Sequence, residues 1–282
     1  MAKRPFRLPR RGNYKAVNSG LGGGWRSGGG GGPSSPGEID SVEGWWDASS
    51  TIYQDTGAVS AADTDGQNVR RWDDQVAAYS FQNPGADPPN YETDKSASPA
   101  VVKSVGAEDF TSLDLFNKSA SDSFSWLWIG GFSANPVAYV GVMGRTNNTT
   151  GTWYIGNNAA DDSWFVYMAE VFNGNRIEID FEVPVVVDQT EHFVVTYGGN
   201  SLASGVTIYR NGTDITSSST TVTDTLGASD FASATSRFNI NAIHNFGSSA
   251  GTYTAEAAVF NTALSADEVS SMWAYHQDKY GL

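Results

Sequence analysis

The amino-acid sequence predicts an all-β protein, a sandwich or jelly roll of short strands that begins with an extended N-terminal arm and ends in a C-terminal α-helix. Strand-like runs of four to ten residues follow one another with polar turns between them, as in sandwiches and barrels. The 31 glycines and the 12 % aromatic content suit such a chain. Asn173-Gly174 and Asn211-Gly212 each lie between two such runs, which is the strongest local signal for a β-hairpin.

Composition divides the chain into a basic, glycine-rich arm, residues 1–37, and a β-rich domain, residues 38–282. Residues 1–36 carry seven of the 17 Lys and Arg and none of the 31 acids, so the rest has 10 basic against 31 acidic residues, a net charge of −21. The arm lacks a hydrophobic period and cannot offset an ordering cost of about 1–2 kcal/mol per residue by itself. We expect it to anchor along a neighbouring protein. A free tail and an arm that neutralises nucleic-acid phosphates are the alternatives.

The expected strands follow in order through the domain. EGWWDA (43–48) opens it, and NVRRWDDQ (68–75) comes after the turn DTDGQ (63–67). SFSWLWIGGFSA (123–134) is strongly apolar and belongs in the core. The other expected strands are TWYIGNN (152–158), SWFVYMAEVF (163–172), RIEIDFEV (176–183), EHFVVTYGG (191–199), GVTIYRNGTDI (205–215), RFNINAI (237–243) and YTAEAAVF (253–260).

The segment LSADEVSSMWAYHQDKYGL (264–282) predicts the helix. Ser265 with Glu268 three residues later makes a capping box at its start, and Gly281 suits its end. One face should pack on the sandwich, because apolar residues recur at roughly helical spacing at Val269, Met272, Trp273 and Tyr280. The chain has no cysteine and no apolar run of about 18 residues, and no apolar segment follows its basic N-terminus. We therefore expect no disulfide, no membrane span and no secretory signal peptide.

Three parts of the chain resemble the concanavalin A-like, or laminin G-like, sandwich domains. YTAEAAVFNTALSADEVSSMWAYHQDKYGL is similar to their closing strand and helix, GWWDASSTIYQ with DGQNVRRWDDQ to their opening, and EHFVVTYGG with GVTIYRNGTDI to their central hairpin. The resemblance covers about residues 40–282 and implies a jelly-roll sandwich of two antiparallel sheets. The fold serves lectins, glucanases, adhesion modules and virion proteins, so it does not select a function. Versions with the closing helix occur in secreted bacterial proteins and in tailed-phage structural proteins, and the basic arm favours the phage setting.

The run RIEIDFEV places Glu178, Asp180 and Glu182 on one face of a strand. It resembles the catalytic strand of laminarinases and lichenases, which implies Glu178 as nucleophile, Asp180 as helper and Glu182 as acid/base. The continuation VPVVVD and the arrival of the next strand about ten residues later depart from those enzymes. The wet face of an antiparallel strand produces the same alternation. We therefore expect no catalysis here and no enzyme activity.

The sequence contains three further kinds of candidate site, built on aspartate, histidine and tryptophan. Two pairs of aspartates offer carboxylates for Ca²⁺: Asp63 with Asp65, and Asp73 with Asp74. An ordinary Asp-Gly turn explains the first pair equally well, so we expect no cofactor. The three histidines, His192, His244 and His276, form no motif and are expected to be structural. Trp153 and Trp164 lie beside loops and are the residues expected to bind a sugar ligand. Alternation with polar neighbours favours a core position for Trp45, Trp46, Trp126 and Trp128.

Together these patterns predict a structural protein on the outer surface of a phage virion, of the capsid decoration or cement type. The major capsid protein or other virion subunits are the expected partners, and a polysaccharide is a weaker one; we expect no membrane partner, and the acidic body should repel nucleic acid. The arm residues expected to contact the partner are Lys3, Arg4, Arg7, Arg10 and Arg11 through charge, and Phe6, Leu8 and Trp25 through apolar pockets. A carbohydrate-binding tail adhesin or fibre is the alternative, and a glycoside hydrolase that uses Glu178, Asp180 and Glu182 comes third.

Overall fold

The structure is a computed structural model of the chain. The arm residues predicted to bind a partner, together with His244 and Asn173, lie outside the residues that it describes. The described residues are 35–50, 52–77, 79–82, 88–93, 101–103, 110–113, 115–136, 139–146, 151–158, 163–171, 174–233, 236–241 and 251–282.

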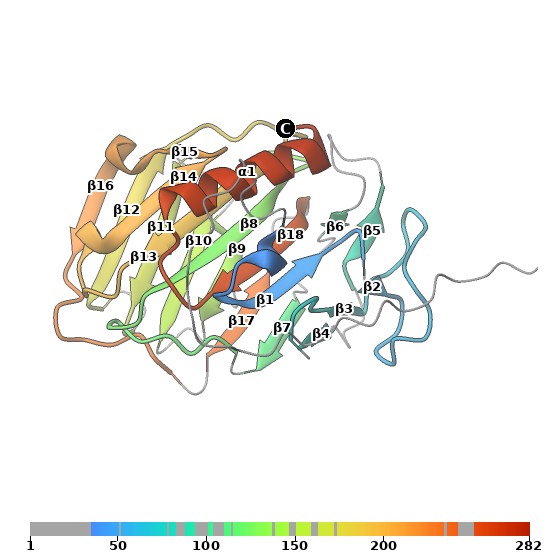
Figure 1. Cartoon of the computed structure of the whole chain (residues 1–282), viewed down its shortest axis with the longest axis horizontal. Helices are drawn as coiled ribbons and strands as arrows, with labels where there is room; N and C mark the ends of the chain where they lie inside the picture. Colours follow the sequence, from blue (N-terminus) through green and yellow to red (C-terminus); the bar gives the residue numbers. More distant parts are fainter. Residues whose placement is uncertain are drawn as a thin grey trace, which may run out of the picture. The chain divides into compact units, whose positions relative to one another are not determined.

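The described strands form two antiparallel sheets that lie face to face (Figure 1). The eight-stranded sheet has the order β15 (Thr213–Asp214), β14 (Val206–Arg210), β13 (Glu191–Tyr197), β8 (Phe124–Phe132), β18 (Thr252–Phe260), β6 (Val101–Lys103) and β5 (Asn90–Glu92), with β1 (Val42–Asp47) also paired to β18. The ten-stranded sheet has the order β16 (Ser219–Asp224), β12 (Arg176–Glu182), β11 (Ser163–Ala169), β10 (Thr152–Asn158), β9 (Tyr139–Thr146), β17 (Arg237–Ile240), β7 (Phe110–Leu113), β4 (Ser80–Gln82), β3 (Arg71–Asp73) and β2 (Ile52–Tyr53). Three short 3₁₀ turns complete the described elements: η1 (Pro36–Glu38), η2 (Ala203–Gly205) and η3 (Thr216–Ser218).

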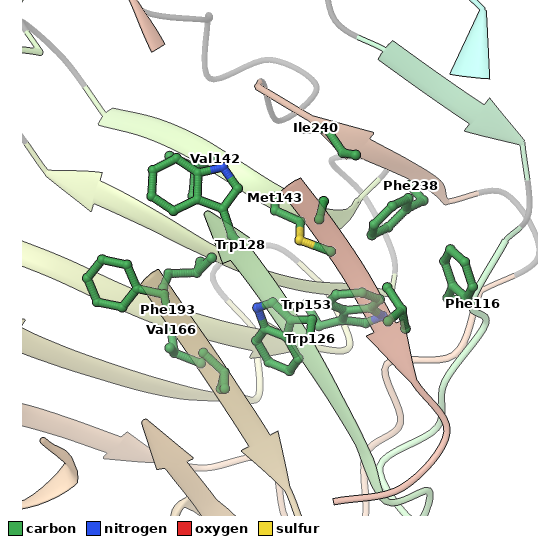
Figure 2. Packing of buried hydrophobic residues seen from close by; sticks show 14 of the residues in the cluster. Phe116, Trp126, Trp128, Val142, Met143, Trp153, Val166, Phe193, Phe238 and Ile240 are labelled. Atoms are coloured by element: carbon green, nitrogen blue, oxygen red, sulfur yellow. The ribbon is translucent and has the colours of Figure 1, made fainter. Parts of the chain in front are cut away.

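The main hydrophobic core fills the space between the two sheets. Alternate residues of the long strands, such as β8, β10, β11 and β13, point into it, and aromatic rings from opposite sheets meet there (Figure 2). The ring centroids of Trp126 on β8 and Trp153 on β10 are 5.0 Å apart, and those of Trp164 on β11 and Phe193 on β13 are 4.4 Å apart. Tilted aromatic pairs of this kind contribute about 0.5–1.5 kcal/mol each beyond the apolar area they bury. The predicted two-sheet jelly-roll sandwich is therefore confirmed.

A second core lies on the outer face of the eight-stranded sheet, where the helix α1 (Ala266–Tyr280) covers it (Figure 1). Strand residues whose side chains point to this outer face, such as Leu127, Ile129 and Val194, pack there with Val269 and Met272 of the helix. No helix among the described residues is long and apolar enough to cross a membrane.

Both ends of α1 form as the sequence predicts. The Glu268 backbone N–H donates to Ser265 Oγ over 3.3 Å, and the Ser265 N–H donates to Glu268 Oε2 over 2.8 Å, so the capping box is complete. Gly281 adopts the left-handed conformation, φ 68°, that ends many helices. The predicted hairpin at Asn211-Gly212 joins β14 to β15, with φ values of 49° and 74° at its two turn residues.

Candidate functional site

The acidic strand β12 presents a charged outer face on the ten-stranded sheet. Its residues alternate between buried Ile177, Ile179 and Phe181 and more exposed polar side chains. Arg176 Nε donates to Glu178 Oε2 over 2.6 Å, and this hydrogen bond raises the pKa of the Arg176 guanidinium. Three carboxylates therefore share this face with one guanidinium, which makes it acidic and suited to a cationic partner.

The geometry of β12 lends no support to the glycosidase hypothesis. Four residues of strand place the Cα atoms of Glu178 and Glu182 about 13 Å apart. A retaining glycosidase holds its two carboxyl groups about 5–5.5 Å apart, so both side chains would have to converge. Glu178 is instead paired with Arg176, which precedes it on the strand, whereas Glu182 follows it. The hydrolase therefore remains the third of the three functional hypotheses.

A small aromatic cluster borders the acidic strand on one side. Phe165 and Tyr167 of β11 stand opposite Asp180 and Glu178 in the strand register. With Tyr154 and Ala169 they form a buried cluster separate from the main core. The Tyr154 and Tyr167 rings are stacked at 5.3 Å, and burial raises the pKa of the Tyr154 hydroxyl well above its ordinary value. On the other side of β12 lie threonines of β16, with Thr223 opposite Glu178 and Thr221 opposite Asp180.

The structure corrects the prediction that Trp153 and Trp164 bind a ligand. Their exposed fractions are 0 % and 1 %, and both rings point into the space between the sheets. In the strand register Trp153 stands opposite Met168 and Trp164 opposite Phe181, and both of these partners also point into the main core. A sugar at the surface cannot stack on either ring. Trp46, Trp126 and Trp128 lie in the core as predicted, whereas Trp45 is only half-buried.

The aspartates considered for calcium accept hydrogen bonds from the protein itself. Asp65 accepts the Thr93 backbone N–H, and Asp73 accepts the Arg71 guanidinium. Asp74 accepts backbone N–H groups, including that of Trp45 over 2.8 Å. The pKa of Asp74 is nevertheless raised, because its burial outweighs these hydrogen bonds. Within the described ranges, no group of three or more His, Asp or Glu side chains is arranged to hold a metal ion.

A buried carboxylate on β18, Glu256, organises a polar network that the sequence analysis missed. Its Oε1 accepts the Trp45 indole N–H over 2.6 Å and lies 3.2 Å from His276 Nε2. Its Oε2 accepts the Lys279 ammonium over 2.7 Å and the Tyr280 hydroxyl over 2.6 Å. Lys279 Nζ also donates to Asp47 Oδ2 over 2.7 Å, so the network ties β18, β1 and α1 together. One sequence signal was available: Glu256 interrupts the apolar run YTAEAAVF.

The charges of this network support one another electrostatically. Burial alone would raise the pKa of Glu256, but His276 and Lys279 hold it down to about 2. The pKa of Lys279 is raised, since attraction to Glu256 and Asp47 outweighs its own burial. Glu256 is thus a buried carboxylate that is charged at neutral pH, and its hydrogen bonds connect the helix to the sheet.

Two of the three histidines meet beside this network. The His192 ring on β13 is fully buried, 5.1 Å from the His276 ring and 5.3 Å from the Trp273 ring. Burial, and then the proximity of His276, lower the pKa of His192 well below its ordinary value. Neither nitrogen of His192 has a hydrogen-bond partner among the described residues. His192 and His276 therefore pack in the second core, which agrees with the structural role predicted for them.

A polar hollow of about 560 Å³ lies at one end of the sandwich, where β8 begins and β18 ends. Its lining offers amide, hydroxyl, carboxylate and ammonium groups from Asn117, Lys118, Ser121, Asp122, Ser123 and Asn261. Asn117 Oδ1 is held by the Arg145 guanidinium and the Ser233 N–H, and Lys118 pairs with Glu43 over 2.6 Å. No aromatic side chain is among the described residues of its lining, so those residues would hold a ligand through hydrogen bonds and through the charges of Lys118 and Asp122.

Comparison with known proteins identifies similar folds at low sequence identity. A mutant of Trypanosoma rangeli sialidase displaying trans-sialidase activity matches with a TM-score of 0.52 and 12 % identity over 86 % of this chain and 34 % of its own. The same sialidase in complex with sialic acid matches with 0.51 and 13 % over 84 % and 33 %, and its complex with the inhibitor DANA with 0.51 and 15 % over 83 % and 37 %.

The chain thus spans about a third of the length of these sialidases. No protein-family model matches it, and no curated protein matches its sequence. At such identities the likeness shows the fold alone and transfers no activity. What this chain shares with these sialidases is a β-sandwich fold.

Proposed function

We propose that this chain is a structural protein of a phage particle, of the capsid decoration type. Its N-terminal arm anchors it to the particle, and its sandwich is displayed at the outer surface. The observation that carries the proposal is the division of charge. Seven cations and no acids lie in residues 1–36, against a net −21 in the rest. An acidic body repels an acidic shell surface, while a basic arm is attracted to it. The function is binding without turnover.

The sandwich supports this proposal because its cores are built from residues beyond the arm. Among the described residues, the main core begins at Trp46 and the second core at Ile39. The Glu256 network then closes the helix over that core. Removal of residues 2–34 would therefore leave both described cores complete, so anchoring and folding can be tested separately.

The test uses phage particles assembled without this chain, to which purified protein is added before sedimentation. Full-length protein should sediment with the particles, and protein lacking residues 2–34 should remain in the supernatant with an unchanged melting temperature. A second full-length variant should also remain in the supernatant; in it, Gln replaces Lys3, Arg4, Arg7, Arg10 and Arg11. A variant with the uncharged Asn13, Asn18 and Ser19 changed to Ala is the matched control and should still bind. Undiminished sedimentation of the truncated protein would overturn the proposal.

The polar hollow favours a second function, weak binding of a polysaccharide. Hydroxyl and amide groups at its wall are the kind that hydrogen-bond sugar hydroxyls, and the absence of an aromatic platform in its lining implies low affinity. Glycan-array binding followed by titration would test it. Binding that Asn261→Ala and Ser121→Ala weaken together would support the hollow as the site, whereas no glycan binding at millimolar sugar would exclude it.

A further inference from the structure

The open edge of β16 is the feature that suggests a further partner. β16 is the terminal strand of the ten-stranded sheet and pairs with β12 on one side only (Figure 1). Thr220, Thr221 and Val222 are exposed, and 53 % of the apolar Val222 faces solvent. β16 has six residues, whereas the terminal strands β2, β15 and β5 have only two or three. β1 also has six residues and pairs on one side only, but its Trp45 N–H donates to Asp74 Oδ1 and its Trp45 carbonyl accepts the Gln75 N–H. Among the described sheet ends, β16 is therefore the long one whose outer backbone edge is not closed in this way.

The backbone groups of this edge can be assigned from the ladder. The Thr225 N–H donates to the Arg176 carbonyl over 2.8 Å, so Thr223 and Thr221 also bond to β12, because bonding alternates along an antiparallel pair. The N–H and C=O groups of Val222 consequently point away from the sheet. Proteins usually protect such an edge with Lys or Pro, and SSTTVTD contains neither. This edge can accept another strand.

The side chains beside the edge specify what that strand should carry. Val222 stands opposite the buried Ile179 and so belongs to the apolar face of the sheet. Thr221 and Thr223 belong to the outer face and stand opposite Asp180 and Glu178. A strand added beyond β16 would lie about 10 Å, two strand spacings, from these carboxylates. An Arg or Lys side chain is long enough to cross the small threonines and reach them.

We propose that the β16 edge binds an extended segment of another protein in which basic and apolar side chains alternate. One face of that segment would place its apolar residues beside Val222, and the other its cations beside the carboxylates of β12. Backbone hydrogen bonds would supply affinity and the alternation would supply specificity, as in strand addition to other sheets. A second copy fits less well, because pairing two β16 strands would bring two acidic β12 rows toward each other.

The probe is the synthetic peptide Thr-Arg-Val-Arg-Val-Arg-Thr, labelled for fluorescence anisotropy and titrated with the full chain. The control peptide has the same composition in blocks, Arg-Arg-Arg-Val-Val-Thr-Thr. Val222→Pro removes the outward N–H but no bond to β12, and Val222→Thr is its matched control with the N–H retained. We expect the alternating peptide to bind at least tenfold more tightly than the blocked one, with a tenfold or greater loss in Val222→Pro and less than a threefold change in Val222→Thr.

A second variant covers the case in which Val222→Pro unfolds the edge. Thr221→Arg leaves the backbone unchanged but puts a cation in the path of the peptide's own cations, and it should weaken binding tenfold at 50 mM NaCl. Equal binding of the two peptides, or indifference to both variants, would overturn the proposal. Self-association in sedimentation velocity that Val222→Pro abolishes would identify a second copy as the occupant and would overturn it as well.

Discussion

Removing the ammonium of Lys279 should cost more stability than removing any surface cation of this protein. The substitution Lys279→Met keeps the length of the side chain and leaves Glu256 with no ammonium beside it. Glu256 is fully buried and the Lys279 side chain is only 16 % exposed, with Nζ–O distances of 2.7 Å to both Glu256 and Asp47. Breaking a buried pair by removing one partner costs about 3–5 kcal/mol, because an uncompensated charge stays inside. A melting-temperature decrease on the order of 10 °C follows for a domain of this size.

Urea unfolding monitored by tryptophan fluorescence would measure the loss. The control is Arg176→Met, which breaks the Arg176–Glu178 pair, whose side chains are 28 % and 27 % exposed, and should cost less than about 1 kcal/mol. The double variant Lys279→Met with Glu256→Gln should recover part of the loss, since it neutralises the stranded carboxylate. Equal free energies of unfolding for Lys279→Met and Arg176→Met would refute the reasoning, because burial would then make no difference.

Three further predictions concern the same layer of the structure. The pKa of Glu256 is depressed to about 2 from an ordinary 4.5, so the stability it contributes is present above pH 4.5 and is lost as the pH falls toward 2. About 3 kcal/mol of the free energy of unfolding should disappear over that range, and Glu256→Gln should reduce this dependence of stability on pH. The depressed pKa of His192 means that the unfolded chain binds the proton first, so stability should decline as pH falls below 6.5, and urea titrations of His192→Leu should lack this decline. Gly212→Ala should lower the melting temperature, since a Cβ there would lie 2.4 Å from the Trp273 ring and φ is +74°, whereas Gly66→Ala, also at positive φ but with open space around it, should lower it less.

Local patterns in the sequence were sufficient to predict the individual elements. The run RIEIDFEV became β12 with its acids outward, and Ser265 with Glu268 marked the start of α1. Alternation and capping depend on residues a few positions apart, so a single segment contains the whole signal.

The parts that the sequence did not reveal depend on distant neighbours. Trp45 and Glu256 are hydrogen-bonded across 211 sequence positions, and nothing near Glu256 in the chain indicates the donors that surround it. Trp153 and Trp164 seemed accessible because loops flank their strands, but the opposite sheet covers both rings. The open edge of β16 likewise became visible only from the strand order, because a terminal and a central strand can have the same residue pattern.

The pairing of β1 with β18 has a consequence for how the protein is made. Val42 pairs with Phe260, so the first long strand of the described domain waits for its partner until nearly all of the domain has been synthesised. The fully buried strand β8 also lacks β18, one of its two flanking strands, until then. Long-range pairings of this kind slow folding and leave apolar strands exposed to aggregation meanwhile. The sandwich should therefore close only after the whole domain has left the ribosome, and newly made chains should depend on chaperones at high expression.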